Sequence, residues 1–164
     1  VLVVGHSYGG VVITAAAHPA NVCGLVYLGA FMPDSGRSLA SYLPPGPLPP
    51  YVTVEGPVSS SVPEFAGLCL YNTCTPEDAA DATGRLVPQD ASVIVTPVGE
   101  AAWRRIPADY VVLERDNAVP LALQEPFSAQ AARVHRLDTD HSPFLCAPEA
   151  LATLLDGIAA RGDA

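Results

Sequence analysis

The 164-residue sequence predicts an α/β fold, with a mostly parallel sheet, flanking helices and one inserted segment. Short runs rich in Val and Leu, each ending near a glycine or an acidic loop, indicate strands that are buried on both faces, as in parallel sheets. Segments of helical character lie between these runs. A proline-rich stretch interrupts the alternation once, which indicates an insertion between two strands of the sheet.

The chain begins with a strand–helix–strand order. Residues 1–4 form a β-branched run that ends at Gly5, and residues 25–28 form a second buried run. Between them, residues 9–17 are small and apolar and predict a helix, which His18-Pro19 closes. The order predicts a βαβ unit with a right-handed crossover.

Residues 31–88 have a different character. Prolines cluster at positions 44, 45, 47, 49 and 50, which excludes a helix or a central strand there. Residues 76–86 predict a helix, because a proline opens them and two acidic residues follow in the first turn. We predict that residues 31–88 form a cap inserted into a single domain, which covers residues 1–164 and is incomplete.

Regular alternation of strands and helices returns after residue 102. Strands are expected at residues 109–113 and 133–137, and helices at residues 119–132 and 148–160. The last helix carries apolar residues at helical spacing, namely Leu151, Leu154, Leu155 and Ile158.

Composition excludes several classes of function. Hydrophobic residues make up 49% of the chain, enough for a buried core, and the formal charge of −9 leaves no basic patch for nucleic acid. No apolar run reaches the roughly 18 residues that a membrane span needs. Because the sequence opens inside a predicted buried strand, we expect the natural N-terminus to lie further upstream. The sequence does not decide whether a signal peptide lies in that upstream segment. Without one, we expect a cytoplasmic location.

The four cysteines, at positions 23, 69, 74 and 146, form no C-x-x-C pair. We therefore expect no metal site and interpret them as reduced thiols that act as small buried hydrophobes. A Cys69–Cys74 disulfide is the alternative.

The run Gly5-His6-Ser7-Tyr8-Gly9 matches G-x-S-x-G between a buried strand and a small-residue helix. A serine on such a tight turn has a strained backbone, and its neighbours must be small so that the turn can close. We predict Ser7 as a nucleophile and the Tyr8 N–H as an oxyanion donor at the helix start. The alternative is an ordinary glycine-rich turn.

A serine nucleophile needs a base, and four histidines are available. His141 follows the last predicted strand, at the edge of a parallel sheet where catalytic groups gather. His18 ends a helix and His135 lies within a strand. His6 lies inside the turn, where its ring should point away from a substrate above Ser7, although its position keeps it among the candidate substrate-binding residues.

An acid must orient the base, and it should follow the strand at residues 109–113. Asp116 lies just before the next helix and is our choice. Glu114 is the rival, with a surface ion pair as its alternative role. Asp138 and Asp140 are near His141 in the sequence, but we expect them to shape its loop.

The runs GHSYGG, LERDNAVP and DTDHSPFL resemble one branch of the α/β-hydrolases. That branch holds bacterial carboxylesterases, pyrethroid-hydrolysing esterases, plant methylesterases and plant hydroxynitrile lyases. The resemblance covers nearly the whole chain, is weakest over residues 44–61, and implies the C-terminal part of an α/β-hydrolase fold.

By the same resemblance, Ser7 is the nucleophile, Asp116 the acid and His141 the base of an esterase that needs no cofactor. Phe31 and Met32 would line the substrate pocket, with ordinary packing under the cap as the alternative. Aromatic residues of the cap favour a small or medium hydrophobic ester: Tyr42, Tyr51, Phe65 and Tyr71.

Two departures from the branch bear on function. The lyases carry a lysine after the catalytic histidine, whereas this chain has Ser142, so ester cleavage is favoured over cyanohydrin cleavage. The resemblance also places a second oxyanion donor upstream of Val1, and upstream strands whose absence would expose a sheet edge. A homo-oligomer is therefore one alternative, and a non-catalytic ligand-binding protein on the same scaffold is another.

Overall fold

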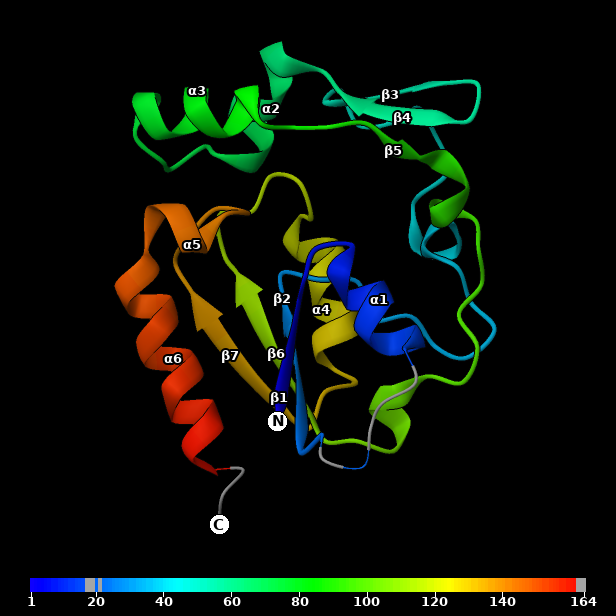
Figure 1. Ribbon diagram of the computed structural model, residues 1–164, viewed down its shortest axis with the longest axis vertical. Coiled ribbons are helices and arrows are strands. Elements are labelled where there is room, and N and C mark those ends of the chain that lie inside the picture. The colour runs from blue at the N-terminus through cyan, green and yellow to red at the C-terminus, as the bar shows by residue number, and fades with distance from the viewer. Residues whose placement is uncertain (17–19, 21, 162–164) are drawn as a thin grey trace.

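The computed structural model describes residues 1–16, 20 and 22–161. Within them, four parallel strands form the main sheet in the order β1-β2-β6-β7 (Figure 1). Their bounds are β1 Leu2–His6, β2 Gly24–Leu28, β6 Ala108–Leu113 and β7 Arg133–Leu137. The parallel sheet confirms the predicted fold class.

Helices cover both faces of this sheet. Helices α1 (Gly9–Ala15) and α4 (Leu121–Ser128) lie on one face, and α6 (Pro148–Arg161) lies on the other (Figure 1). Alternate residues of β6 divide between the two layers, since side chains along a strand point to opposite faces. Tyr110 and Val112 pack in the core beneath α1 and α4, whereas Val111 and Leu113 pack against α6.

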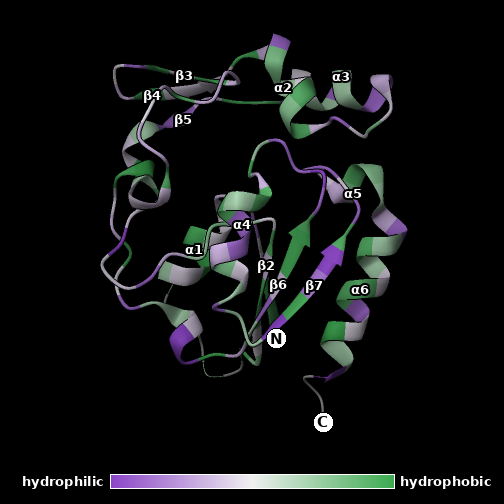
Figure 2. Ribbon diagram, turned by 180° about the vertical axis from the view of Figure 1, so that it is seen from behind, coloured by the Kyte–Doolittle hydropathy of each residue, from purple (hydrophilic) through white to green (hydrophobic). Residues whose placement is uncertain are grey.

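The two central strands differ from the flanking strand β7 in their burial. Every residue of β2 and β6 is buried, whereas β7 carries exposed Arg133 and Arg136 and is hydrophilic over its arrowhead (Figure 2). Burial on both faces explains why β2 and β6 read as continuous apolar runs in the sequence.

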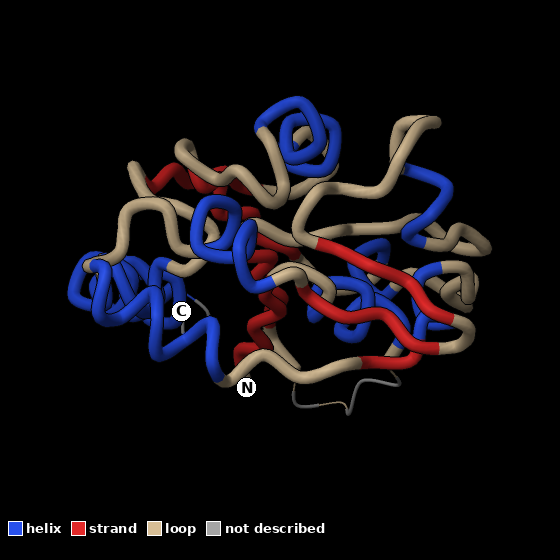
Figure 3. The backbone as a smooth tube through the Cα atoms, turned by 90° about the horizontal axis from the view of Figure 1, so that it is seen from above, coloured by secondary structure: helices blue, strands red, loops and turns tan. Residues whose placement is uncertain are grey.

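The part of the predicted cap from β3 to α3 lies beyond the C-terminal ends of the main strands (Figure 1). It holds an antiparallel hairpin of β3 (Val52–Glu55) and β4 (Val58–Ser61), followed by helices α2 (Pro63–Leu70) and α3 (Pro76–Gly84). Strand β5 (Gln89–Asp90) begins directly after the cap and pairs with β4. Seen from above, this small sheet lies on the side of the molecule opposite α6 (Figure 3).

Short helices complete the chain, and none of the described helices is long and apolar enough to cross a membrane. They are α5 (Pro143–Cys146) and the 3₁₀ helices η1 (Leu39–Tyr42), η2 (Ala91–Ile94) and η3 (Ala102–Arg104).

Several predicted boundaries are corrected by the structure. The helix expected at residues 119–132 begins only at Leu121, because a residue that precedes a proline is pushed out of the helical region, and Val119 precedes Pro120. It ends at Ser128, two residues after an internal proline. The β3–β4 hairpin and α2 were not predicted. The expected closure of the first helix at His18-Pro19 lies outside the described residues.

Candidate active site

Ser7 lies at a sharp turn between β1 and α1. Its φ of +54° is the only positive value for a non-glycine among the described residues, in a region that costs an L-residue about 1–2 kcal/mol. The backbone around it compensates: Ser7 N–H donates to Leu28 O (3.2 Å), and Ser7 O accepts from the N–H groups of Gly10 (3.1 Å) and Phe31 (3.2 Å). The turn is therefore held by the second strand and the residues that follow it.

Two glycines let the turn close. A Cβ at Gly5 would lie 2.7 Å from Gly9 O, and a Cβ at Gly10 would lie 2.2 Å from Phe31 O. Both contacts are with backbone atoms, which cannot rotate away. At Gly9, by contrast, a Cβ would meet no atom within 4 Å. The requirement for small residues thus holds at Gly5 and Gly10 but not at Gly9.

Asp116 and His141 form a buried pair. His141 Nδ1 lies 2.7 Å from Asp116 Oδ2, and both residues are about 95% buried, at 4% and 5% exposure. The other carboxylate oxygen, Oδ1, accepts from the N–H groups of Ala118 and Val119, each at 2.8 Å. With both oxygens engaged, the carboxylate cannot rotate. An imidazole that donates from Nδ1 to it keeps Nε2 as its proton acceptor.

The rival acids have other partners. Glu114 is exposed and forms an ion pair with Arg136, and Asp138 is exposed and forms one with Arg115. Asp140 is fully buried, but it accepts from the N–H groups of Thr73 and Ser142. None of these contacts reaches the His141 ring, so the structure pairs His141 with Asp116, as predicted, and Asp140 shapes the loop.

The Ser7 turn and the Asp116–His141 pair meet at the same edge of the sheet. Gly29, which follows β2 directly after the Ser7 partner Leu28, has a φ of +49°, and a Cβ there would lie 3.2 Å from Asp116 Oδ2. The ring of His6, the neighbour of Ser7, lies 4.5 Å from the His141 ring between centroids. The ends of β1, β2, β6 and β7 thus gather the three predicted catalytic residues.

His6 supports the loop that carries His141. Its Nε2 lies 2.7 Å from His141 O, so Nε2 carries a proton and donates to that carbonyl. Burial, together with the neighbouring His141, lowers the pKa of His6 to about 4, so that the ring is neutral at physiological pH. His135, in contrast, bonds to Asp109 at the far end of the sheet, and His18 lies outside the described residues.

The two predicted pocket residues lie in the core. Met32 has no exposed surface, and Phe31 is 8% exposed and packs edge-on against Phe127, with ring centroids 6.0 Å apart. Both belong to the hydrophobic cluster beneath α1 and α4. These contacts show packing under the cap, and the binding role of both residues stays a prediction.

Sequence reasoning missed Gln124 of α4. Its side chain has no exposure and accepts from Leu113 N–H (2.9 Å), while its amide donates to Leu113 O (3.0 Å) and Val119 O (2.7 Å). These bonds fix both ends of the segment that carries Asp116. No motif marks this glutamine, because its partners are backbone atoms brought near by the fold.

The cysteines differ from expectation in their burial. All four thiols are free, so the alternative Cys69–Cys74 disulfide is not formed, but Cys23 is exposed and the other three are only partly buried. The prediction of reduced thiols is confirmed, but their interpretation as small buried hydrophobes is wrong. Cys23 directly precedes β2, and the others lie in α2, in the turn between α2 and α3, and at the end of α5.

Two surface hollows do not mark the site. One, of about 570 Å³, runs along α6, and the other, of about 450 Å³, lies between η3 and the end of α4. Neither is lined by Ser7, Asp116 or His141. The assignment of the site rests on side-chain geometry and on the turn at Ser7.

A strained serine at a strand-to-helix turn, with a buried Asp–His pair at the same edge of a parallel sheet, defines the α/β-hydrolase class of fold and site. The model of the Alpha/beta hydrolase family matches residues 1–154, and the chain belongs to that family.

Relatives and solved structures agree with this membership. The chain is 31% identical over 171 residues to Alpha/beta hydrolase nvfD of Aspergillus novofumigatus (strain IBT 16806), covering 94% of this chain and 68% of the relative. It is 49% identical over 57 residues to the Carbendazim hydrolyzing esterase of Nocardioides sp. (strain SG-4G), covering 34% of this chain and 23% of the relative. The structure of a pyrethroid hydrolase from Sphingobium faniae JZ-2 has a TM-score of 0.81 at 24% identity, covers 99% of this chain and 70% of its own, and shows the shared fold.

Proposed function

We propose that this chain is a serine hydrolase that cleaves carboxylic esters through an acyl-enzyme, with Ser7 as nucleophile, His141 as base and Asp116 as orienting acid. The observation that carries the proposal is the buried 2.7 Å contact between Asp116 Oδ2 and His141 Nδ1, beside a serine with a φ of +54°. A surface ion pair would not require such burial, and an ordinary turn would not place a serine in that conformation.

The reaction follows from the tautomer that Asp116 imposes. His141 Nε2 takes the proton of the Ser7 hydroxyl as Ser7 Oγ attacks the ester carbonyl carbon. Asp116 stabilises the imidazolium without taking its proton. His141 then protonates the leaving alkoxide, and the carbonyl reforms as an acyl-serine. A water, deprotonated by His141, attacks this acyl group, releases the acid and restores Ser7. No step uses a cofactor.

The negative oxygen formed in both steps needs preorganised donors. Tyr8 N–H, at the start of α1, is our proposed donor from this chain, and the Tyr8 side chain is anchored separately by its hydroxyl, which donates to Val93 O (3.1 Å). One such donor is worth about 10²–10³ in kcat. In this fold the second donor comes from a loop that precedes the serine strand.

The substrate class follows from the cap. Two aromatic residues lie beside the catalytic loops. Tyr51 of the cap donates to Ala118 O (3.1 Å), beside Asp116, and Phe144 of α5 packs edge-on against His6. Together with Phe31 and Met32 they favour a small or medium hydrophobic ester. The names of the relatives, an esterase that hydrolyses carbendazim and a pyrethroid hydrolase, support this choice.

The competing lyase reaction lacks its charged group. Ser142, which follows His141, is 2% exposed, and the sequence contains no lysine. A neutral buried hydroxyl cannot balance the charge of cyanide.

Hydrolysis of a series of p-nitrophenyl esters tests the proposal. We expect turnover of the short-chain esters, loss of it in Ser7→Ala, and no loss in Ser35→Ala, a serine of an exposed turn outside the site. Turnover that survives Ser7→Ala would overturn the assignment of the nucleophile, and release of cyanide from cyanohydrins without ester turnover would favour the lyase.

A further inference from the structure

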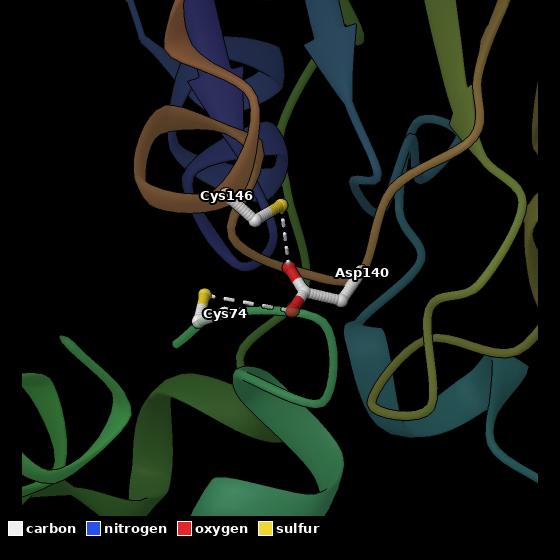
Figure 4. Close-up of side chains that lie close together, drawn as sticks. All are labelled: Cys74, Asp140 and Cys146. Atoms are coloured by element: carbon white, nitrogen blue, oxygen red, sulfur yellow. Dashed lines mark hydrogen bonds between the residues drawn. The ribbon is translucent and has the colours of Figure 1, made fainter. Parts of the chain in front are cut away.

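Three potential metal ligands converge where the cap meets the catalytic loop (Figure 4). Cys74 lies in the turn between α2 and α3, Asp140 directly precedes His141, and Cys146 ends α5. Cys146 Sγ lies 3.2 Å from Asp140 Oδ1, and Cys74 Sγ lies 3.6 Å from Asp140 Oδ2. The ligand atoms of all three residues lie within 4.8 Å of one another. The two thiols therefore flank a single carboxylate.

These separations suit a tetrahedral cation. With metal–sulfur bonds of about 2.3 Å and metal–oxygen bonds of about 2.1 Å, neighbouring sulfur and oxygen ligands lie about 3.6 Å apart, and two sulfur ligands about 3.8 Å apart. The observed sulfur–oxygen distances, 3.2 Å and 3.6 Å, are near the first value. Each sulfur contacts a different oxygen of Asp140, so the side chains must adjust to place both sulfurs and one oxygen on the same ion.

A fourth group lies beside the cluster. Thr73 donates its N–H to Asp140 Oδ2 (2.7 Å). Its side chain also interacts with Asp140 and Cys146, and its buried Oγ1 atom has no well-aligned hydrogen-bond partner. This hydroxyl is therefore within reach of an ion held by Asp140 and Cys146.

We propose that Cys74, Asp140 and Cys146 bind a thiophilic divalent cation of the Zn²⁺ type, with Thr73 Oγ1 or a water at its fourth position. Two thiolates and one carboxylate are the donor set that such a cation prefers. Both cysteines are partly exposed, so the ion can enter from solvent. Binding would join the cap directly to the loop that carries His141.

The charges balance without any further group. Without a cation, the thiols of Cys74 and Cys146 each donate a hydrogen bond to the Asp140 carboxylate. A divalent ion replaces both thiol protons, forms two metal–sulfur bonds and releases two protons to solvent, so the net charge of the site stays at −1.

Titration of the reduced 164-residue chain with Co²⁺, a spectroscopic substitute for Zn²⁺, tests the site. We expect one Co²⁺ per chain, a thiolate-to-cobalt charge-transfer band in the near ultraviolet, about two protons released per ion in weak buffer, and loss of the band on addition of Zn²⁺. Cys74→Ser and Cys146→Ser should each remove about half of the band and weaken binding roughly tenfold or more. Cys69→Ser is the matched control, because Cys69 is a free, partly buried cysteine of α2 outside the cluster.

Three outcomes would overturn the proposal. The first is a folded chain, verified by circular dichroism, that shows no charge-transfer band. The second is a band that persists in the Cys74→Ser/Cys146→Ser double variant or falls equally in Cys69→Ser. The third is recovery of a Cys74–Cys146 disulfide from the purified chain with no cation uptake after its reduction, which would assign the pair to a cross-link. None of these readouts depends on ester hydrolysis.

Discussion

At Asp116, both carboxylate oxygens are engaged, one by His141 and one by two backbone N–H groups. The residue can therefore orient His141 only as a charged acceptor. Asp116→Asn keeps the shape but presents an amide, which favours the wrong tautomer of His141 and should lower kcat about 10⁴-fold. The measurement is steady-state ester hydrolysis, with Glu114→Gln as the control expected to retain activity. Equal losses of activity in Asp116→Asn and Glu114→Gln would contradict the assignment of Asp116 as the acid that orients His141.

His6 gives the protein a pH-dependent stability. In the unfolded chain its pKa is near 6.5, whereas burial and the neighbouring His141 hold it at about 4 in the folded protein. The unfolded state thus gains a proton first as the pH falls, so this contribution is fully present above pH 6.5 and is lost toward pH 4. The loss should reach about 3 kcal/mol near pH 4.

Urea unfolding at pH 7 and pH 4.5 measures this effect. The His6→Gln variant keeps a side-chain N–H for His141 O but does not titrate, so its free energy of unfolding should fall less over the same interval. An identical fall in the variant and the parent would show that other groups cause the acid sensitivity.

The sequence was most informative for residues whose chemistry depends on local context. Ser7 was predicted from its turn, and His141 and Asp116 from their places after predicted strands, and the structure brings Asp116 and His141 into contact. Gln124 and the Thr73–Asp140 bond were missed, because each joins a side chain to a backbone atom, which can belong to any residue type. Such pairs leave no pattern in a single sequence.

At the scale of elements, the turn from β1 to α1 depends on which glycine is replaced. Gly10→Ala would place a methyl group against the carbonyl of Phe31. Because the Phe31 N–H donates to Ser7 O, a shift of Phe31 would disturb the turn at Ser7. We expect Gly10→Ala to lower the free energy of unfolding by about 1–3 kcal/mol and to reduce ester turnover. Gly9→Ala meets no atom and should change stability by less than about 1 kcal/mol. Thermal melts of both variants would check this, and equal effects would contradict it.

The far end of the sheet is held by Asp109 at the start of β6. This buried carboxylate accepts from Arg133 of β7, His135 of β7 and Arg161 at the end of α6. Burial alone would raise its pKa, but these donors outweigh it and hold the pKa below its usual value. Asp109 therefore joins the edge strand and the last helix to the central sheet.

Asp109→Ala should cost about 2–3 kcal/mol of stability, the lower end for a broken buried pair, because its arginine partners are half-exposed and regain water. Ester turnover per folded molecule should persist, since the cluster lies at the opposite end of β6 from Asp116. Asp138→Ala, which removes only an exposed pair with Arg115, is the control. A melting temperature unchanged by Asp109→Ala would refute the argument.

Elements were predictable where periodicity was strong. The continuous apolar runs of β2 and β6 and the regular spacing in α6 gave their positions to within one or two residues. The β3–β4 hairpin gave only a weak signal, because β3 alternates over just four residues, Val-Thr-Val-Glu, and β4 is mostly serine. Its two-residue turn, Gly56-Pro57, has glycine at the first position with a φ of +59°, as type II′ turns require, and this signal was overlooked within the proline-rich stretch.

For the whole molecule, the part of the cap from β3 to α3 contacts the catalytic loops through isolated polar bonds. Side-chain bonds run from Asn72 to Arg115 O, from Asn117 to Leu68 O and from Tyr51 to Ala118 O. Large apolar side chains of α2 stay exposed, namely Phe65 and Leu68. We expect the cap to open at lower free energy than the sheet. Amides of β3, β4, α2 and α3 should exchange with deuterium faster than those of β2 and β6, and equal protection would show a single cooperative unit.

The parallel topology followed from the strand–helix–strand order and the right-handed rule, without any long-range information. The placement of the cap across the catalytic loops did not, because its contacts join segments that are remote in sequence and carry no shared motif. The proline-rich residues near the start of the cap excluded a helix or a central strand in that stretch, but they did not predict where the cap lies relative to the sheet.

The central claim, that Ser7 is activated by a base held in this fold, is tested most directly by mass spectrometry after treatment with a fluorophosphonate. Such a reagent labels a serine only when a neighbouring base activates it. We predict one adduct on the peptide that contains Ser7, absent in Ser7→Ala and strongly reduced in Asp116→Asn. A chain that is folded by circular dichroism and whose Ser7 takes no label would contradict the account and favour a non-catalytic ligand-binding role.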